Sequence, residues 1–335
     1  MELFISHESA LEHWRKYRKL PAQSTQRRCT AALPESVPSV GSLIFSGLSL
    51  PIHIVVGSPG ARPDSKLARS HVFQGETPVG CFMNIGNSLM ISSPEFCFLQ
   101  MASLCTLVEL IELGYELCGA YSLPLPNDKK VPEIGFYKHP PFTSTKKLQA
   151  FLADMPGAKG HQQAMRALLY LQDGAASPME TKLAMLLVLP YQLGGYGFPK
   201  PILNHRIDLP KAARRFFRKS YYVCDLYWAS AKVAVEYDSD QQHTGTERIA
   251  NDSERRNALA LSGVKVVSVT RRQLFSKTEL ESSARTIAGH LGRRLQFKRS
   301  RFDAVHQELR NQLLANFSYA MEQEGLAEGA AGRYR

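Results

Sequence analysis

The chain has 335 residues, of which 44% are hydrophobic and 21% charged. This composition is typical of a globular protein with about two cores of ~150 residues each. The formal net charge of +11 and a pI near 9.4 predict attraction to a polyanion. Because the sequence shows no amphipathic terminal anchor, we expect that polyanion to be nucleic acid rather than a membrane. The alternative is a basic protein that its charge merely keeps in solution.

The cysteines and the apolar segments indicate in which cellular compartment the protein lies. The 6 cysteines have no CxxC or Cys/His ligand spacing and are typical of reduced, buried thiols in a cytosolic protein. The first 20 residues carry charges where a signal peptide needs an apolar core. The most apolar segment, 96–117, is interrupted by one glutamine and three glutamates, which a bilayer-spanning helix tolerates poorly. We therefore expect a cytoplasmic protein with no membrane span.

Residues 1–120 are predicted to form a small α+β domain. Helical spacing begins after Ser6, and a helical pair starts at Ser93-Pro94-Glu95 and ends near Gly119. Short apolar runs between them predict strands at 52–56, 68–73, 80–85 and 88–91. His53 and His71 fall on separate strands, where a hydrogen-bonded or solvent-facing histidine is commoner than a metal ligand.

This organisation, together with the segment SPEFCFLQMA at 93–102, resembles the N-terminal region of AbiEi-type antitoxins and related predicted regulators. The resemblance implies a targeting or regulatory role for residues 1–120. A winged helix, which those antitoxins often carry, is not visible in the sequence.

The rest of the chain is predicted to be a linker, a second domain and a tail. Residues 121–159 contain a Pro- and Lys-rich stretch and a helix. In residues 160–300 the pattern predicts an α/β core in the order helix, three strands, helix, strand. These elements start at Ser177-Pro178, cover 202–207, 221–227 and 232–237, continue through 247–262, and finish at 264–269. Residues 301–335 are expected to add a C-terminal helix and a disordered tail.

Two acidic residues stand at the ends of neighbouring apolar strands in this core. The segment Ala229-Ser230-Ala231 allows a hairpin that sets Asp225 opposite Glu236. Two close carboxylates repel each other unless a cation lies between them, and oxygen ligands suit Mg²⁺. The alternative is that they cap strand ends or pair with Arg255 and Arg256. Acids within an apolar strand are costly without a partner, which favours the metal site.

These residues belong to a longer pattern, formed by Asp225, the triplet Glu236-Tyr237-Asp238, His243, and the series Asp252, Arg255, Leu259 and Gly263. The pattern resembles the PD-(D/E)XK nuclease superfamily, and within it the branch of Vsr-like endonuclease domains, whose spacing the last four residues keep. The resemblance implies a restriction-endonuclease-like fold for residues 160–300. Two features matter: the superfamily's lysine is Asp238 here, as is usual in the Vsr-like branch, and His243 lies one position further along than in the commonest form of the branch.

The resemblance also implies a role for each site residue. Asp225, Glu236 and Asp238 would hold Mg²⁺ or Mn²⁺, although Asp238 equally suits a turn. His243 would replace the missing lysine as general base or proton donor, or else is a surface loop histidine. Glu180 would lie behind the metal, but Ser177-x-x-Glu180 also matches a helix capping box.

Basic residues near the acids are expected to bind the phosphates of the nucleic acid. Arg255 or Arg256 would bind the scissile phosphate, with an intrahelical Asp252–Arg256 pair as the alternative. Further basic residues precede the core strands or follow the core: Lys200, Arg206, Lys211, Arg214, Arg215, Arg218, Lys219, Arg285, Arg293, Arg294, Lys298, Arg299 and Arg301. We therefore predict a metal-dependent DNA endonuclease of bacterial defence or mobile elements, with a partner protein encoded nearby. The alternative is a non-cleaving nucleic-acid-binding regulator of the antitoxin type.

Overall fold

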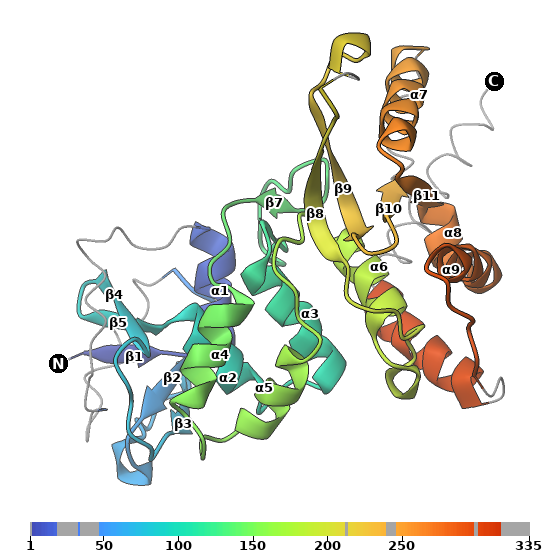
Figure 1. Cartoon of the computed structure of the whole chain (residues 1–335). Coiled ribbons are helices and arrows are strands. Elements are labelled where there is room, and N and C mark those ends of the chain that lie inside the picture. The colour runs from blue at the N-terminus through green and yellow to red at the C-terminus, as the bar shows by residue number, and fades with distance from the viewer. Residues whose placement is uncertain are drawn as a thin grey trace, which may run out of the picture. The chain divides into compact units, whose positions relative to one another are not determined.

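The computed structural model of the chain describes residues 2–18, 33, 47–211, 214–238, 246–297 and 301–315. It is a mixed α and β structure that divides into two compact units, Met1–Pro178 and Met179–Arg335 (Figure 1). Each unit has its own sheet and its own buried core, so we describe them separately. None of the helices in the described ranges combines the length and hydrophobicity that crossing a bilayer requires.

The first unit is built on a five-stranded sheet in the order β3-β2-β1-β5-β4. Its strands are β1 (Leu3–Ile5), β2 (Ile52–Val56), β3 (Ala68–Val72), β4 (Phe82–Gly86) and β5 (Leu89–Ser92). The β1–β5 and β2–β3 pairs are parallel, and the β1–β2 and β4–β5 pairs are antiparallel. The sequence does not predict the central strand β1, because three consecutive buried residues are too few to show an alternating pattern.

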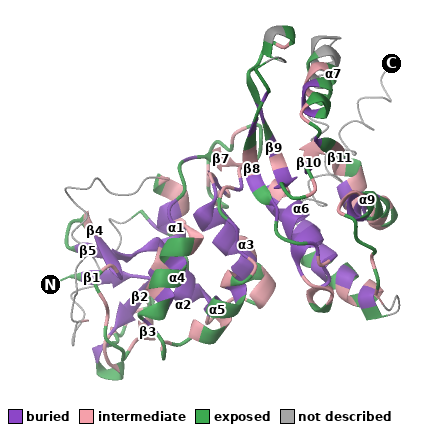
Figure 2. Cartoon of the chain, viewed as in Figure 1, coloured by how far each residue is buried: buried purple, intermediate pink, exposed green. Residues whose placement is uncertain are grey.

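Helices cover this sheet and close the core of the first unit. They are α1 (His7–Tyr17), α2 (Pro94–Met101), α3 (Leu107–Cys118), α4 (Thr145–Ala153) and α5 (His161–Leu168), with a 3₁₀ turn at Pro59–Ala61. The predicted start of α2 is confirmed, since the Ser93 hydroxyl accepts the Phe96 N–H at 3.2 Å. Thr106 and Glu109 form a capping box at the start of α3. Buried residues concentrate on α2, α3 and the middle strands (Figure 2).

Residues 121–159, for which the sequence predicts a linker with a helix, are packed into the first unit. They contain β6 (Tyr121–Ser122) and β7 (Tyr137–Lys138), which pair with each other, and α4, which packs against α2 and α5. The Tyr121 side chain is almost fully buried. The Pro and Lys content of the segment gave no sign of these few anchoring apolar residues.

A buried ion pair joins α1 to α3. Arg15 donates two hydrogen bonds to the Glu116 carboxylate, at 2.9 and 2.7 Å, and Glu116 also accepts the Leu123 N–H at 2.9 Å. Only 3% of the Glu116 side chain is exposed. A carboxylate charge at that depth is tolerated because the Arg15 guanidinium and the Leu123 N–H both donate hydrogen bonds to it.

The second unit has the predicted order of elements: α6 (Pro178–Val188), β8 (Ile202–Asp208), β9 (Tyr221–Trp228), β10 (Val233–Asp238), α7 (Thr246–Leu261) and β11 (Lys265–Thr270). Two helices that the sequence does not predict follow, α8 (Arg271–Phe275) and α9 (Lys277–His290), and residues 301–315 are helical. Short 3₁₀ turns lie at Tyr191–Leu193 and Arg214–Phe216. The sheet order is β11-β10-β9-β8, with β10 and β11 parallel and the other pairs antiparallel.

Helix α7 connects the two parallel strands and packs on the sheet. Its Ala258 and Leu259 lie in a buried cluster with Tyr222, Cys224 and Ala234. Helix α7 ends at Leu261, just before the predicted stop at Gly263. The φ of Gly263 is +73°, a backbone conformation that a residue with a Cβ adopts only at a cost in free energy. This packing fixes α7 beside the ends of β9 and β10.

We expect Glu116→Gln to destabilise the first unit by about 3 kcal/mol, because it leaves the buried Arg15 guanidinium without a counter-charge. Urea unfolding would be followed by the fluorescence of Trp14, which is fully buried in this unit, in a Trp228→Phe background. The matched control is Glu133→Gln, at an exposed position of the same unit. A loss no larger than that of the control would contradict the role of the ion pair.

Candidate active site

Asp225 is the central carboxylate of the second unit. Regular pairing between β9 and β10 runs as far as Val235 opposite Leu226. Beyond that pair, a side chain of β9 accepts the bond from β10: the Tyr237 backbone N–H donates to Asp225 Oδ2 at 2.8 Å. Burial raises the pKa of the Asp225 carboxyl to about 7, and repulsion from Glu180 and then Glu236 adds to the rise. Three carboxylates therefore lie within electrostatic reach of one another.

Glu180 reaches this cluster from the first turn of α6. Its Oε2 accepts the Asn204 side-chain N–H at 2.7 Å. Asn204 lies on β8 between Leu203, which pairs with Leu226, and His205, which pairs with Cys224, so it stands beside Asp225. The backbone φ of Asn204 is +46°, a left-handed conformation that asparagine tolerates better than most residues and that recurs at functional sites.

The sequence does not predict a role for Asn204. The available signal is a polar amide within the strand 202–207, but a strand asparagine without a known neighbour has no defined partner. Its position opposite Asp225 follows from the register of β8 and β9, which only the structure fixes.

Glu236 is held by Arg255. Arg255 on α7 forms an ion pair with its carboxylate and also donates to the Val223 carbonyl at 2.6 Å. Burial raises the pKa of the neighbouring Cys224 thiol to about 12, and the Glu236 charge contributes. A thiol with that pKa stays protonated at neutral pH, so the arrangement offers carboxylate oxygens and no thiolate.

The structure thus gathers Glu180, Asp225, Glu236 and Arg255 of the predicted site. Asp238 is half-buried at the end of β10, in register with Thr270 of β11, and its role as a ligand stays a prediction. Arg256 is exposed on α7. His243 and the side chain of Asp252 lie outside the described residues.

The basic residues before β9 lie on the surface of the second unit. Arg206 pairs with Asp208 at 2.8 Å and stacks 3.8 Å from the centre of the Tyr221 ring. Lys211, Arg214 and Lys219 are exposed. Exposed guanidinium and ammonium groups beside an exposed aromatic ring suit a phosphate backbone with bases to stack.

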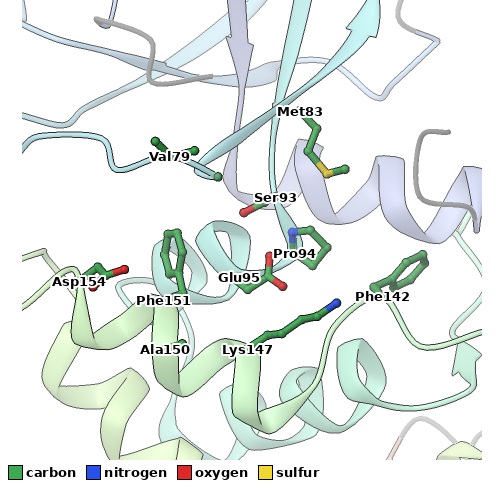
Figure 3. Close-up of a pocket in the computed structure, with 11 residues that line it drawn as sticks. Val79, Met83, Ser93, Pro94, Glu95, Phe142, Lys147, Ala150, Phe151 and Asp154 are labelled. Carbon is green, nitrogen blue, oxygen red and sulfur yellow. The ribbon is translucent and has the colours of Figure 1, made fainter. Parts of the chain in front are cut away.

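The first unit contains a separate pocket of about 240 Å³, whose lining is shown in Figure 3. Its charged residues are Glu95, Lys147 and Asp154, and Glu95 accepts the Thr143 hydroxyl at 2.5 Å. The pocket contains none of the residues predicted for the site. It therefore plays no part in the chemistry considered below.

The two strand acids, Asp225 and Glu236, offer carboxylate oxygens, the donor type that Mg²⁺ and Mn²⁺ prefer. Repulsion and burial together make a free Asp225 carboxylate costly, and a bound cation would relieve both effects. Glu236 and Asp225 would be the ligands, and Glu180, fixed by Asn204, would lie behind them.

Comparison of the chain with known protein families, with curated proteins and with solved structures finds no significant match. The residues and their arrangement therefore carry the functional argument.

We expect Asp225→Asn to stabilise the metal-free second unit by up to about 4 kcal/mol at pH 8, since about three pKa units correspond to that free energy. The folded pKa of about 7 exceeds the unfolded value near ~3.9, so wild-type stability falls as pH rises between them, and the amide removes that loss. The gain should shrink towards pH 4. Thermal unfolding in EDTA, followed by Trp228 fluorescence in a Trp14→Phe background, measures it.

Asp208→Asn is the matched control for this experiment. Asp208 is an exposed carboxylate of the same unit, and the hydrogen bond from Arg206 lowers its pKa. Its amide should therefore give no stabilisation at either pH. If Asp225→Asn and Asp208→Asn changed the stability of the unit equally at each pH, the repulsion inferred at Asp225 would be contradicted.

Proposed function

We propose that the second unit is a metal-dependent nuclease of the PD-(D/E)XK type that hydrolyses DNA phosphodiester bonds. The observation that carries the proposal is the meeting of Glu180, Asp225 and Glu236 at one end of the sheet, with the pKa of Asp225 raised to about 7. Clustered carboxylates with perturbed pKa values are typical of catalytic centres and of metal sites.

The architecture of the unit supports the proposal. Its order of helix, three antiparallel strands, helix and parallel strand is the one that the restriction-endonuclease-like fold implies. Asp225 and Glu236, the acids of the pattern that resembles this superfamily, lie on the neighbouring antiparallel strands β9 and β10.

Each site residue would have a defined task. When bound, Mg²⁺ or Mn²⁺ supplies a water of lowered pKa and a Lewis acid for the phosphate oxygens. Asp225 and Glu236 hold and orient that ion, and the Tyr237 N–H keeps Asp225 in place. Arg255, which lies beside Glu236, would donate N–H groups to the scissile phosphate. Exposed basic residues would bind the rest of the DNA backbone.

One observation favours a second candidate, a non-cleaving nucleic-acid-binding regulator. The Arg255 guanidinium already neutralises Glu236, so part of the charge that would recruit a cation is balanced within the protein. The lysine that activates water in the superfamily is also replaced by Asp238. A binder would keep the basic surface and lose the hydrolysis.

The test is cleavage of supercoiled plasmid by the purified full-length protein with Mg²⁺ or Mn²⁺. We expect Asp225→Asn and Glu236→Gln each to reduce the rate by on the order of 10³-fold, because each removes a ligand of an ion that stabilises the transition state by several kcal/mol. Glu308→Gln, an exposed change in the helix 301–315, is the control and should cleave at the wild-type rate.

Gel-shift assays on the same samples separate the two candidates. A nuclease should bind DNA in all variants and cut only when both acids are present. DNA binding that weakens steeply with salt, with no cutting by any version, would establish the regulator and overturn the nuclease proposal. A single-stranded RNA substrate beside the plasmid would show whether DNA is the preferred substrate.

A further inference from the structure

A second cluster of metal-ligating side chains lies in the first unit, away from every residue used above. Glu8, His53 and His71 each contribute one ligand atom, and these atoms all lie within 4.8 Å of one another. They come from three elements that are distant in sequence: the first turn of α1, β2 and β3.

The fold of the first unit sets this geometry. In the parallel pairing of β2 and β3, His71 stands beside Val55, two residues beyond His53, so both imidazoles lie on the same face of the sheet. The Ser9 hydroxyl accepts the His53 N–H at 2.9 Å, and the Ser6 N–H donates to the His53 carbonyl at 2.9 Å. These bonds fasten the start of α1, and with it Glu8, over the two histidines.

The His53 Nδ1 atom has two close neighbours and can form a full hydrogen bond with only one of them. The Nδ1 atom of His53 lies 2.5 Å from Glu8 Oε2 and 3.1 Å from His71 Nε2. A ring nitrogen carries one proton or one lone pair. If Nδ1 donates to Glu8, it has no lone pair for His71; if it accepts from His71, its lone pair faces a carboxylate. A cation at the centre would satisfy all three donors at once.

A third histidine, His7, lies against the cluster. The His7 ring stacks on His71 with centroids 3.6 Å apart, and the His7 Nδ1 atom lies 3.0 Å from the Ser6 hydroxyl. His7 thus holds the His71 ring in place from behind, as outer-shell residues do at metal sites.

We propose that Glu8 Oε2, His53 Nδ1 and His71 Nε2 bind a divalent transition-metal ion of the zinc class. Two imidazoles and a carboxylate are a common zinc donor set, with bonds of about 2.0–2.2 Å that space the ligand atoms by roughly 3.4 Å. The three atoms require only small side-chain rotations to reach that spacing. Three protein ligands leave the fourth tetrahedral position for water or a ligand.

The ion would fasten the N-terminal helix to the sheet. Glu8 is the only ligand on α1, and 48% of its side chain is exposed, whereas His53 is buried on β2. Binding therefore couples an exposed side chain of the helix to two strands of the core. This role does not depend on nuclease activity in the second unit.

The test uses the full-length protein carrying Asp225→Asn and Glu236→Gln, which removes the other candidate metal site. After treatment with EDTA, it is titrated with Zn²⁺ and, separately, with Co²⁺. We expect one ion per chain and the visible absorption of tetrahedral Co²⁺. His71→Ala should weaken binding by at least about 100-fold, because two donors remain. Glu8→Gln should weaken it less and shift the Co²⁺ spectrum, since an amide replaces the carboxylate.

Matched controls keep the result interpretable. His161→Gln changes a histidine of the same unit outside the cluster and should leave both the stoichiometry and the spectrum unchanged. Trp14 fluorescence reports whether each variant keeps the fold of α1, and His71, half-buried on the edge strand β3, is the milder of the two histidine sites to change. Absence of stoichiometric binding in the parent protein, or unchanged affinity in folded His71→Ala, would overturn the proposal.

Discussion

Repulsion among carboxylates confined at one end of a sheet is the constraint on which the second unit depends. Asp225 is half-buried, within electrostatic reach of both Glu180 and Glu236, and its pKa is raised to about 7. The β9–β10 hairpin, α6 and α7 hold the acids together despite this cost, through the Tyr237 N–H, Asn204 and Arg255. This crowding of charge costs stability, and carboxylates with perturbed pKa values are typical of functional sites.

The two candidate sites, one in each unit, are built from similar elements. In each, a helix start delivers a glutamate, Glu8 on α1 and Glu180 on α6, to side chains carried by neighbouring strands. The ligand types differ, because imidazoles join the carboxylate in the first unit and only carboxylates meet in the second. The donor sets therefore suit different ions, zinc-class in one and Mg²⁺ or Mn²⁺ in the other.

Strong local signals account for the elements that the sequence predicts correctly. The Ser93-Pro94 start of α2, the run from 247 to 262 before Gly263, and the two apolar strands around 229–231 all carry their own caps or turns. The helices α8 and α9 are missed although Thr270 and Ser276 cap them, whereas two other failures lack such signals. β1 is three residues long, and the packed segment 121–159 is held by a few buried side chains in a Pro- and Lys-rich background.

The sequence by itself determined the order of elements in the second unit and the presence of one of the two acids on each of the strands β9 and β10, because periodicity and turn residues act locally along the chain. Only the tertiary structure decided that Asn204 joins Glu180, that Arg255 pairs with Glu236, and that His53 and His71 converge on Glu8. Those contacts depend on strand register and helix docking. Both are set by burial of surfaces from distant segments, which no local pattern encodes.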